Sequence, residues 1–124
     1  MIYTRRVYDG GENKGKAYLV DRIWPRGIKK EDLDIEAWLK ELAPGDDLRV
    51  WFHHEPDQWL WFKEKYHEEL ERMPDKWEPV LEAARHGDVT LLYGASDTEH
   101  NNAVALKEYL EAKLRESGTP VRKS

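Results

Sequence analysis

The stretch VTLLYGASDTEHNNAVALKEYL, residues 89–110, decides the fold class of this chain. It opens with a short run of apolar and β-branched residues, Val89–Tyr93, which predicts a buried strand. Its second half carries apolar residues at helical spacing, which predicts an amphipathic helix. Ser96 and Glu99 lie between the two with the spacing of a capping box, so we expect the helix to begin there. A strand followed directly by a helix is typical of α/β proteins.

Two segments nearer the N-terminus also predict strands. Ile2–Tyr8 is rich in β-branched and aromatic residues, and Ala17–Asp21 is apolar enough to be buried on both faces. The segment 9–15 between them contains three glycines and is typical of a turn or a mobile loop.

The middle of the chain predicts helices, because large apolar residues recur there at helical spacing. The first expected helix is Ile35–Leu42, and a short second one carries Leu48–Phe52. The third has Pro56 in its first turn and stops at Pro74. The fourth carries Trp77–Ala84 and ends at His86-Gly87. Strands separated by helices need crossover connections. We therefore expect a small, mostly parallel sheet flanked by helices, which is a three-layer, Rossmann-like α/β sandwich. The pattern shows three strands and is compatible with a fourth.

The size and composition of the chain indicate a single folded domain. The chain has 124 residues, of which 40% are hydrophobic, and it contains six Trp and six Tyr, residues in which disordered chains are poor. We expect one domain over residues 1–116 and a flexible tail over residues 117–124.

The composition also excludes several classes of function. The chain has no cysteine, which excludes disulfides, thiolate metal sites and cysteine nucleophiles. Its N-terminus lacks the apolar stretch of a signal peptide, and no window reaches the ~20 apolar residues of a membrane span, so we expect a cytoplasmic protein with no membrane partner. The formal net charge of −5 disfavours general nucleic-acid binding without excluding a local basic patch. No phosphate-binding glycine loop or redox fingerprint is present, so no cofactor is expected.

A first group of candidate site residues follows the strand 17–21. Ligands of open α/β sheets lie beyond the carboxyl ends of the strands, where this group falls. The group consists of Asp21, Arg22, Trp24 and Arg26. Arg22 and Arg26 offer planar guanidinium groups that suit a phosphate or a carboxylate, so an anionic ligand is expected. In the structural alternative, Asp21 and an arginine pair to hold the loop while Trp24 packs in the core.

A second group follows the strand 89–93. It consists of Ser96, Asp97, His100 and Asn101. The start of a helix favours anions, and His100 falls near the apolar stripe, so we expect it to turn inward, where it could transfer a proton beside Asp97. In the structural alternative these residues only cap the helix and bond buried backbone. If both strand ends face one crevice, the two groups form a single site.

His53 is the reserve candidate for proton transfer. The neighbouring pair His53-His54 is a poor metal site, because adjacent residues of a helix or strand point in different directions. A metal shared by His53, Asp97 and His100 lacks any established ligand spacing, so no metal is assigned. Trp61 falls off the apolar stripe of its helix and is expected to be exposed, as an interface residue would be.

Three blocks of this sequence resemble the YeaO-like family of uncharacterised proteins, a domain-of-unknown-function family numbered 488. The blocks are Val20–Gly27 (VDRIWPRG), Trp51–Pro56 (WFHHEP) and Leu91–Asp97 (LLYGASD) with Glu99–Asn101 (EHN). The resemblance covers residues 3–114 and implies a compact α/β fold without implying an activity. This chain departs from the pattern at Gly94 and Ser96, where the resemblance implies alanine and lysine.

Taken together, the residues predict a small protein that binds, and could hydrolyse, an anionic phosphate- or nucleotide-like small molecule in a polar crevice. Arg22 and Arg26 would hold the anion, and His100 would move the proton if a reaction occurs. Two alternatives are a non-catalytic module for protein or nucleic-acid interaction and a metal-dependent hydrolase. The sequence assigns no oligomeric state.

Overall fold

The computed structural model describes residues 1–122, and for residues 117–122 it describes the backbone alone. The strands are β1 (Ile2–Arg6), β2 (Lys16–Leu19), β3 (Ala37–Trp38) and β4 (Val89–Tyr93). The α-helices are α1 (Asp46–His54), α2 (Trp59–Glu71), α3 (Pro74–His86) and α4 (Asn102–Arg122). Single turns of 3₁₀-helix, η1 (Lys30–Asp32) and η2 (Lys40–Leu42), lie on either side of β3.

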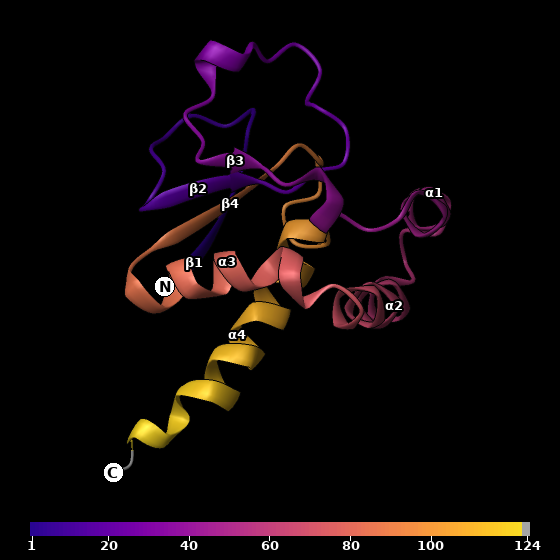
Figure 1. Cartoon of the computed structure of the whole chain (residues 1–124). Coiled ribbons are helices and arrows are strands. Elements are labelled where there is room, and N and C mark those ends of the chain that lie inside the picture. Colours follow the sequence, from indigo (N-terminus) through magenta and orange to yellow (C-terminus); the bar gives the residue numbers. More distant parts are fainter. Residues whose placement is uncertain (123–124) are drawn as a thin grey trace.

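The strands of the described chain form one parallel sheet in the order β1-β4-β2-β3 (Figure 1). The strand predicted at residues 89–93 is confirmed with those limits and lies in the middle of the sheet. Each of its residues is buried, as expected of a central strand covered on both faces. Because β4 lies between β1 and β2, the carboxyl ends of β4 and β2 come side by side.

Side chains of β2 and β4 alternate between two hydrophobic cores, because successive residues of a strand point to opposite faces. The larger core lies against the helices and receives Tyr18 and Val20 from β2 and its extension and Val89, Leu91 and Tyr93 from β4. The smaller core on the opposite face receives Ala17, Leu19 and Leu92.

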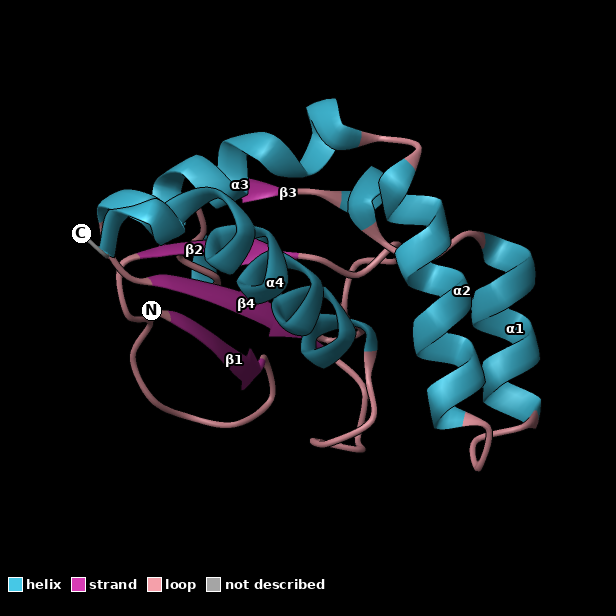
Figure 2. Ribbon diagram, turned by 90° about the horizontal axis from the view of Figure 1, so that it is seen from below, coloured by secondary structure: helices cyan, strands magenta, loops and turns pink. Residues whose placement is uncertain are grey.

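The α/β sandwich is confirmed, and its two outer layers differ. Figure 2 shows α3 and α4 across one face of the sheet, with α1 and α2 side by side beyond the ends to which the strand arrows point. The opposite face is covered by the segment between β2 and β3, which is irregular apart from η1. Trp24 and Trp38 meet edge to face there, with ring centroids 5.3 Å apart, and supply the apolar area that a helix would otherwise give.

The helix predicted over Ile35–Leu42 is wrong, and the fourth strand lies in that segment. Ala37 and Trp38 pair in parallel with Tyr18 and Leu19 of β2. The amide of Leu39 continues the pairing by donating to the carbonyl of Leu19 at 2.8 Å. The apolar residues here fit both a helical stripe and a strand, and the open edge of β2 decides between them.

Two other boundaries also differ from the expectation. Pro56 lies in the turn between α1 and α2 and not in the first turn of α2, which begins at Trp59. The predicted flexible tail falls on residues 117–124, whose side chains or placement the structure does not describe, so the division at residue 116 stays a prediction.

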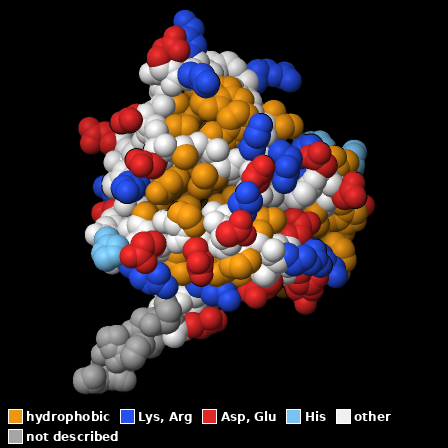
Figure 3. Space-filling model, viewed as in Figure 1, with side chains coloured by type: hydrophobic (Ala, Val, Ile, Leu, Met, Phe, Trp, Pro, Cys, Tyr) orange, Lys and Arg blue, Asp and Glu red, His pale blue; other side chains and the backbone are white. Residues whose placement is uncertain are grey.

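The surface mixes charges of both signs. Figure 3 shows cationic and anionic side chains intermingled on one face of the molecule, with apolar groups between them. None of the helices in the described part of the chain combines the length and the apolar character needed to cross a membrane.

Candidate functional site

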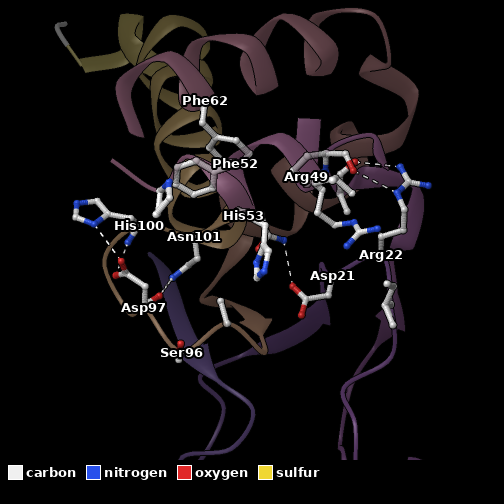
Figure 4. A pocket seen from close by; sticks show the side chains of 17 residues that line it. Asp21, Arg22, Arg49, Phe52, His53, Phe62, Ser96, Asp97, His100 and Asn101 are labelled. Atoms are coloured by element: carbon white, nitrogen blue, oxygen red, sulfur yellow. Dashed lines mark hydrogen bonds and ion pairs between the residues drawn. The ribbon is translucent and has the colours of Figure 1, made fainter. Parts of the chain in front are cut away.

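A cavity of about 570 Å³ lies beyond the carboxyl ends of β2 and β4. Its walls come from the residues that follow these strands, from the corner at Ala43-Pro44 and from α1 and α2. Asp21 and Arg22 from the first predicted group and Ser96, Asp97, His100 and Asn101 from the second all line it (Figure 4). The condition that both strand ends face one crevice is therefore met for these six residues. A second hollow of about 620 Å³ lies near residues 11–17 and 32–36 and contains none of the predicted site residues.

Asp21 is fixed where the two strand ends meet. One carboxylate oxygen accepts a hydrogen bond from the amide of Gly94 at 2.8 Å, and the other accepts one from Asn102 Nδ2 at 3.2 Å. The same Asn102 amide donates to the carbonyl of Val20 at 2.8 Å, which ties α4 to β2. Burial raises the pKa of the Asp21 carboxyl, and the donors at Gly94 and Asn102 lower it by less. The site thus contains a desolvated carboxylate in a fixed orientation.

Two arginines stand at one end of the cavity (Figure 4). Arg22 donates from Nε to the carbonyl of Pro44 and from Nη2 to that of Ala43, each at 3.2 Å. Arg49 of α1 lies 3.2 Å from Asp46 Oδ1, and Arg22 lies 3.8 Å from the same oxygen. Arg22 therefore holds the corner before α1 in place, while Arg49, whose side chain is 42% exposed, is the arginine better able to turn toward a ligand.

One face of α1 forms a wall of the cavity. Arg49, Phe52 and His53 on the helix and Pro56 just after it line the cavity at the spacing i, i+3, i+4 and i+7. Phe52 stacks on Phe62 of α2, with centroids 4.2 Å apart and planes inclined by 19°. Arg49 and Phe52 are not among the residues that the sequence predicted for the site. Arg49 lies four residues before His53, and this helical spacing was the signal that could have found it, whereas Phe52 gave no such signal.

Asp97 organises the loop that follows β4. Its Oδ1 accepts hydrogen bonds from the amides of Glu99 at 2.9 Å and His100 at 3.0 Å, and its Oδ2 lies 3.2 Å from His100 Nδ1. The two backbone donors, first Glu99 and then His100, hold the pKa of the Asp97 carboxyl below its usual range. Asp97 therefore stays ionised, and one of its two carboxylate oxygens is occupied by hydrogen bonds within the loop.

His100 does not turn inward as predicted. Its side chain is 44% exposed and packs on Trp59, with ring centroids 5.1 Å apart. The helix begins later than the capping box implied, so the predicted helical wheel does not apply to this residue. His100 and Asp97 form an ion pair at the rim of the cavity if the imidazole is protonated.

The capping box predicted at Ser96 and Glu99 is also wrong. Helix α4 begins at Asn102, and the cap is Asn101, whose Oδ1 accepts from the amide of Val104 at 3.0 Å. Asn101 is buried and donates from Nδ2 to the carbonyl of Asp97 at 2.9 Å. Asn101 thus fixes the start of the helix, and Ser96 is exposed at the cavity wall.

Trp24 and Arg26 are not brought into the site. Trp24 packs in the smaller core and donates from Nε1 to the carbonyl of Ile28 at 2.6 Å, as the structural alternative expected. Arg26 is exposed in the turn before Gly27, and neither residue lines the cavity. The loop turns back over the opposite face of the sheet after Arg22, which local sequence could not reveal.

The site combines a fixed carboxylate, two guanidinium groups, two imidazoles and a stacked pair of phenyl rings. Such a set can hold a flat ligand that carries an anion at one end. Among the side chains that the structure describes, those of residues 1–116, no three from His, Asp or Glu lie close enough together to hold a metal ion.

These features define a parallel α/β domain with a cavity at the carboxyl ends of its central strands. The chain belongs to the family described as the "Inactive DUF488-N3 subclade", whose family model matches residues 1–124. It is 40% identical over 112 residues to the uncharacterized protein YeaO of Escherichia coli, across 90% of this chain and 97% of that protein. It is 47% identical over 70 residues to the uncharacterized protein Rv3073c of Mycobacterium tuberculosis, across 56% of this chain and 59% of that protein.

The resemblance to the YeaO-like family drawn from the three sequence blocks is therefore confirmed. No solved structure matches the fold closely enough to add a further comparison.

Proposed function

We propose that this protein binds a phosphate-bearing, nucleotide-like small molecule in the cavity beyond β2 and β4 and releases it unchanged. The observation that carries this proposal is the juxtaposition of Arg22 and Arg49 with the stacked rings of Phe52 and Phe62 in a cavity of about 570 Å³. Ligand sites combine an apolar wall with a few polar groups in this way, and this volume suits a molecule of nucleotide size.

The arginine end would hold the phosphate. Arg49 and Arg22 both lie within 4 Å of Asp46 Oδ1, and that carboxylate is 70% exposed. A phosphate offers more acceptor oxygens than one carboxylate and suits the forked geometry of guanidinium. An incoming phosphate would compete with Asp46 for Arg49, while Arg22 keeps its bonds to the backbone corner.

The aromatic wall would hold the flat part of the ligand. Phe52 is half-buried and already stacked on Phe62, so its ring is fixed before a ligand arrives. A preformed aromatic face costs little ordering entropy on binding. His53 lies next to Phe52 on the same wall and can donate a hydrogen bond.

Binding without turnover is favoured by two observations. The matching family is described as an inactive subclade. His100, the predicted proton-transfer group, is 44% exposed and packs on Trp59 at the rim of the cavity, so its imidazole is not held inside the site. We assign Asp97 and His100 to the rim of a binding site, and hydrolysis is not part of the proposal.

The test is a thermal-shift titration with inorganic phosphate, ribose 5-phosphate and adenosine 5′-monophosphate. A ligand present at about 100 times its Kd adds about 2.7 kcal/mol, which raises the Tm of a domain this size by several degrees. We expect the largest shift from the nucleotide and its loss in Arg49→Ala.

Arg26→Ala is the matched control, because Arg26 is an exposed arginine outside the cavity. Its shift should equal that of the wild type. Equal shifts in Arg49→Ala and wild type, or no shift with any of the three compounds, would contradict the proposal.

The other functions considered for the sequence have weaker support. Trp61 is exposed as predicted, at 46%, but its ring packs on Trp51 with centroids 4.6 Å apart. Charges of both signs alternate on the face shown in Figure 3, which does not suit a phosphate backbone. The metal-dependent hydrolase receives no support from the arrangement of the described side chains, those of residues 1–116.

A further inference from the structure

The most unusual polar group of the cavity is the Asp21 carboxylate. Asp21 is partly buried, and a carboxylate withdrawn from water is normally paired with a cation, because burial of an unpaired charge is costly. None of the ion pairs in the described part of the chain includes Asp21, although Arg22 follows it directly. Arg22 instead donates to the carbonyls of Ala43 and Pro44. The carboxylate is therefore held in place by neutral donors alone.

Those neutral donors leave part of its hydrogen-bonding capacity unused. A carboxylate has about four acceptor sites. The amides of Gly94 and Asn102 occupy one on each oxygen, at 2.8 and 3.2 Å. Asp21 also lines the cavity, so its remaining acceptor sites are available to a ligand.

The backbone around Asp21 is arranged to keep the carboxylate there. A Cβ on Gly94 would lie 3.2 Å from Asp21 Oδ2, so the absence of a side chain permits this close approach. The carbonyl of Asp21 accepts a hydrogen bond from Trp38 Nε1 at 2.7 Å, which fixes the main chain from the other side. Contacts on both sides of the residue thus hold an acceptor at the cavity wall before any ligand binds.

We propose that Asp21 recognises the hydroxyl groups of a sugar, so that the ligand is a ribonucleoside monophosphate whose 2′- and 3′-hydroxyls donate to this carboxylate. The inference rests on the proposed function, because the phosphate at Arg49 and the base on Phe52 orient the sugar between them. Figure 4 shows Asp21 lying between the arginines and the histidine end of the site, which is where the middle of such a ligand falls.

A hydroxyl contact to Asp21 would distinguish a ribonucleotide from other anions. A free phosphate or a simple carboxylate would reach Arg49 but would leave Asp21 without a donor. A site built to accept a hydroxyl discriminates strongly against an analogue that lacks it, because its polar group is then left unpaired. Hydrogen bonds to a charged partner contribute enough that we expect a loss of roughly 10- to 100-fold in affinity.

The experiment compares adenosine 5′-monophosphate with its 2′,3′-dideoxy analogue by isothermal titration calorimetry. We expect the wild type to bind the dideoxy compound roughly 10- to 100-fold more weakly. Asp21→Asn should bring the two affinities close together by weakening the hydroxyl-bearing ligand. Asp32→Asn, an exposed aspartate on η1, should behave as the wild type.

Asp21→Asn replaces one acceptor oxygen by an amide donor, so it could fold poorly. The wild type then supplies a second readout, which is the ¹³C resonance of the Asp21 carboxyl group during each titration. We expect this resonance to move with adenosine 5′-monophosphate and to stay nearly in place with the dideoxy analogue.

The outcomes distinguish the two proposals. Equal affinity of the wild type for both nucleotides, together with loss of binding in Arg49→Ala, would overturn the role of Asp21 and keep the proposed function. Binding of neither nucleotide would overturn both. Discrimination that persists unchanged in Asp21→Asn would assign the hydroxyl contact to another residue and overturn this inference.

Discussion

Two aspartates in the same cavity show how local surroundings set the chemistry of a residue. Asp21 is desolvated, and burial raises its pKa even though two N–H groups point at it. Asp97 is exposed, and the backbone donors of its own loop lower its pKa. The sequence presents both simply as aspartates after strands. One is suited to contact a ligand and the other to stabilise a loop.

The lowered pKa of Asp97 gives a pH dependence that can be measured. A carboxyl group with a lower pKa in the folded state stabilises the protein above its unfolded pKa of about 3.9, and that contribution is lost as the pH falls. We expect Asp97→Asn to have a lower Tm than the wild type at pH 7, and the difference between the two Tm values to shrink as the pH falls below the unfolded pKa. Thermal denaturation followed by circular dichroism across this range measures the difference.

Asp32→Asn serves as the control, because it removes the same charge from an exposed residue of η1. If Asp97→Asn and Asp32→Asn show the same dependence of Tm on pH, the backbone bonds of Asp97 do not stabilise the loop and the prediction is wrong.

At the scale of the element, the start of α4 is set by a buried asparagine. Asn101 accepts from the amide of Val104 and also reaches back to the carbonyl of Asp97. Loss of an asparagine cap typically costs about 1 kcal/mol. Because the Asn101 side chain also donates to a carbonyl, we expect Asn101→Ala to cost somewhat more than a cap alone.

The matched comparison is Ser96→Ala, at the position that the sequence favoured as the cap. Ser96 is exposed and far from the first turn of α4, so this change should leave the free energy of unfolding within about 0.5 kcal/mol of wild type. Urea denaturation of both variants decides the question. A larger loss at Ser96 than at Asn101 would restore the capping box.

At the scale of the whole molecule, the strand order places β4 between β1 and β2, so the loop that connects β1 to β2 must pass over β4. Thr90 of β4 fixes that crossing, because its hydroxyl accepts from the amide of Lys14 and donates to the Lys14 carbonyl, each at 2.9 Å. Thr90 is 1% exposed, so water cannot replace these bonds without disturbing the packing. One hydroxyl thus anchors the loop that replaces a crossover helix.

We expect Thr90→Val to destabilise the protein by about 1 kcal/mol, because the amide and carbonyl of Lys14 both lose the hydroxyl that they bond. The midpoint of urea denaturation should fall while the m value stays the same. Thr98→Val provides the control at an exposed threonine and should change little. Amide exchange of Lys14 gives a direct check, since its protection should be lost in Thr90→Val alone.

Local pattern predicted a large part of this molecule. The limits of β4 and the existence of α1, α2 and α3 followed from apolar runs and helical stripes. The convergence of Asp21 with Asp97 and His100 followed from one topological rule, that parallel strands end at the same edge. The site residues that escaped prediction, Arg49 and Phe52, lie on α1, which packs over that edge from elsewhere in the chain.

The sequence by itself determined which segments are apolar, how they alternate, and hence that the chain builds a parallel α/β sandwich with polar residues after its strands. Tertiary structure alone decided that Ile35–Leu42 contributes a strand, because the free edge of β2 offers hydrogen bonds that a helix would not use. It also turned His100 outward and took Trp24 and Arg26 away from the cavity. Periodicity reports which face of a segment is apolar, whereas the partner that covers that face is set by contacts between distant parts of the chain.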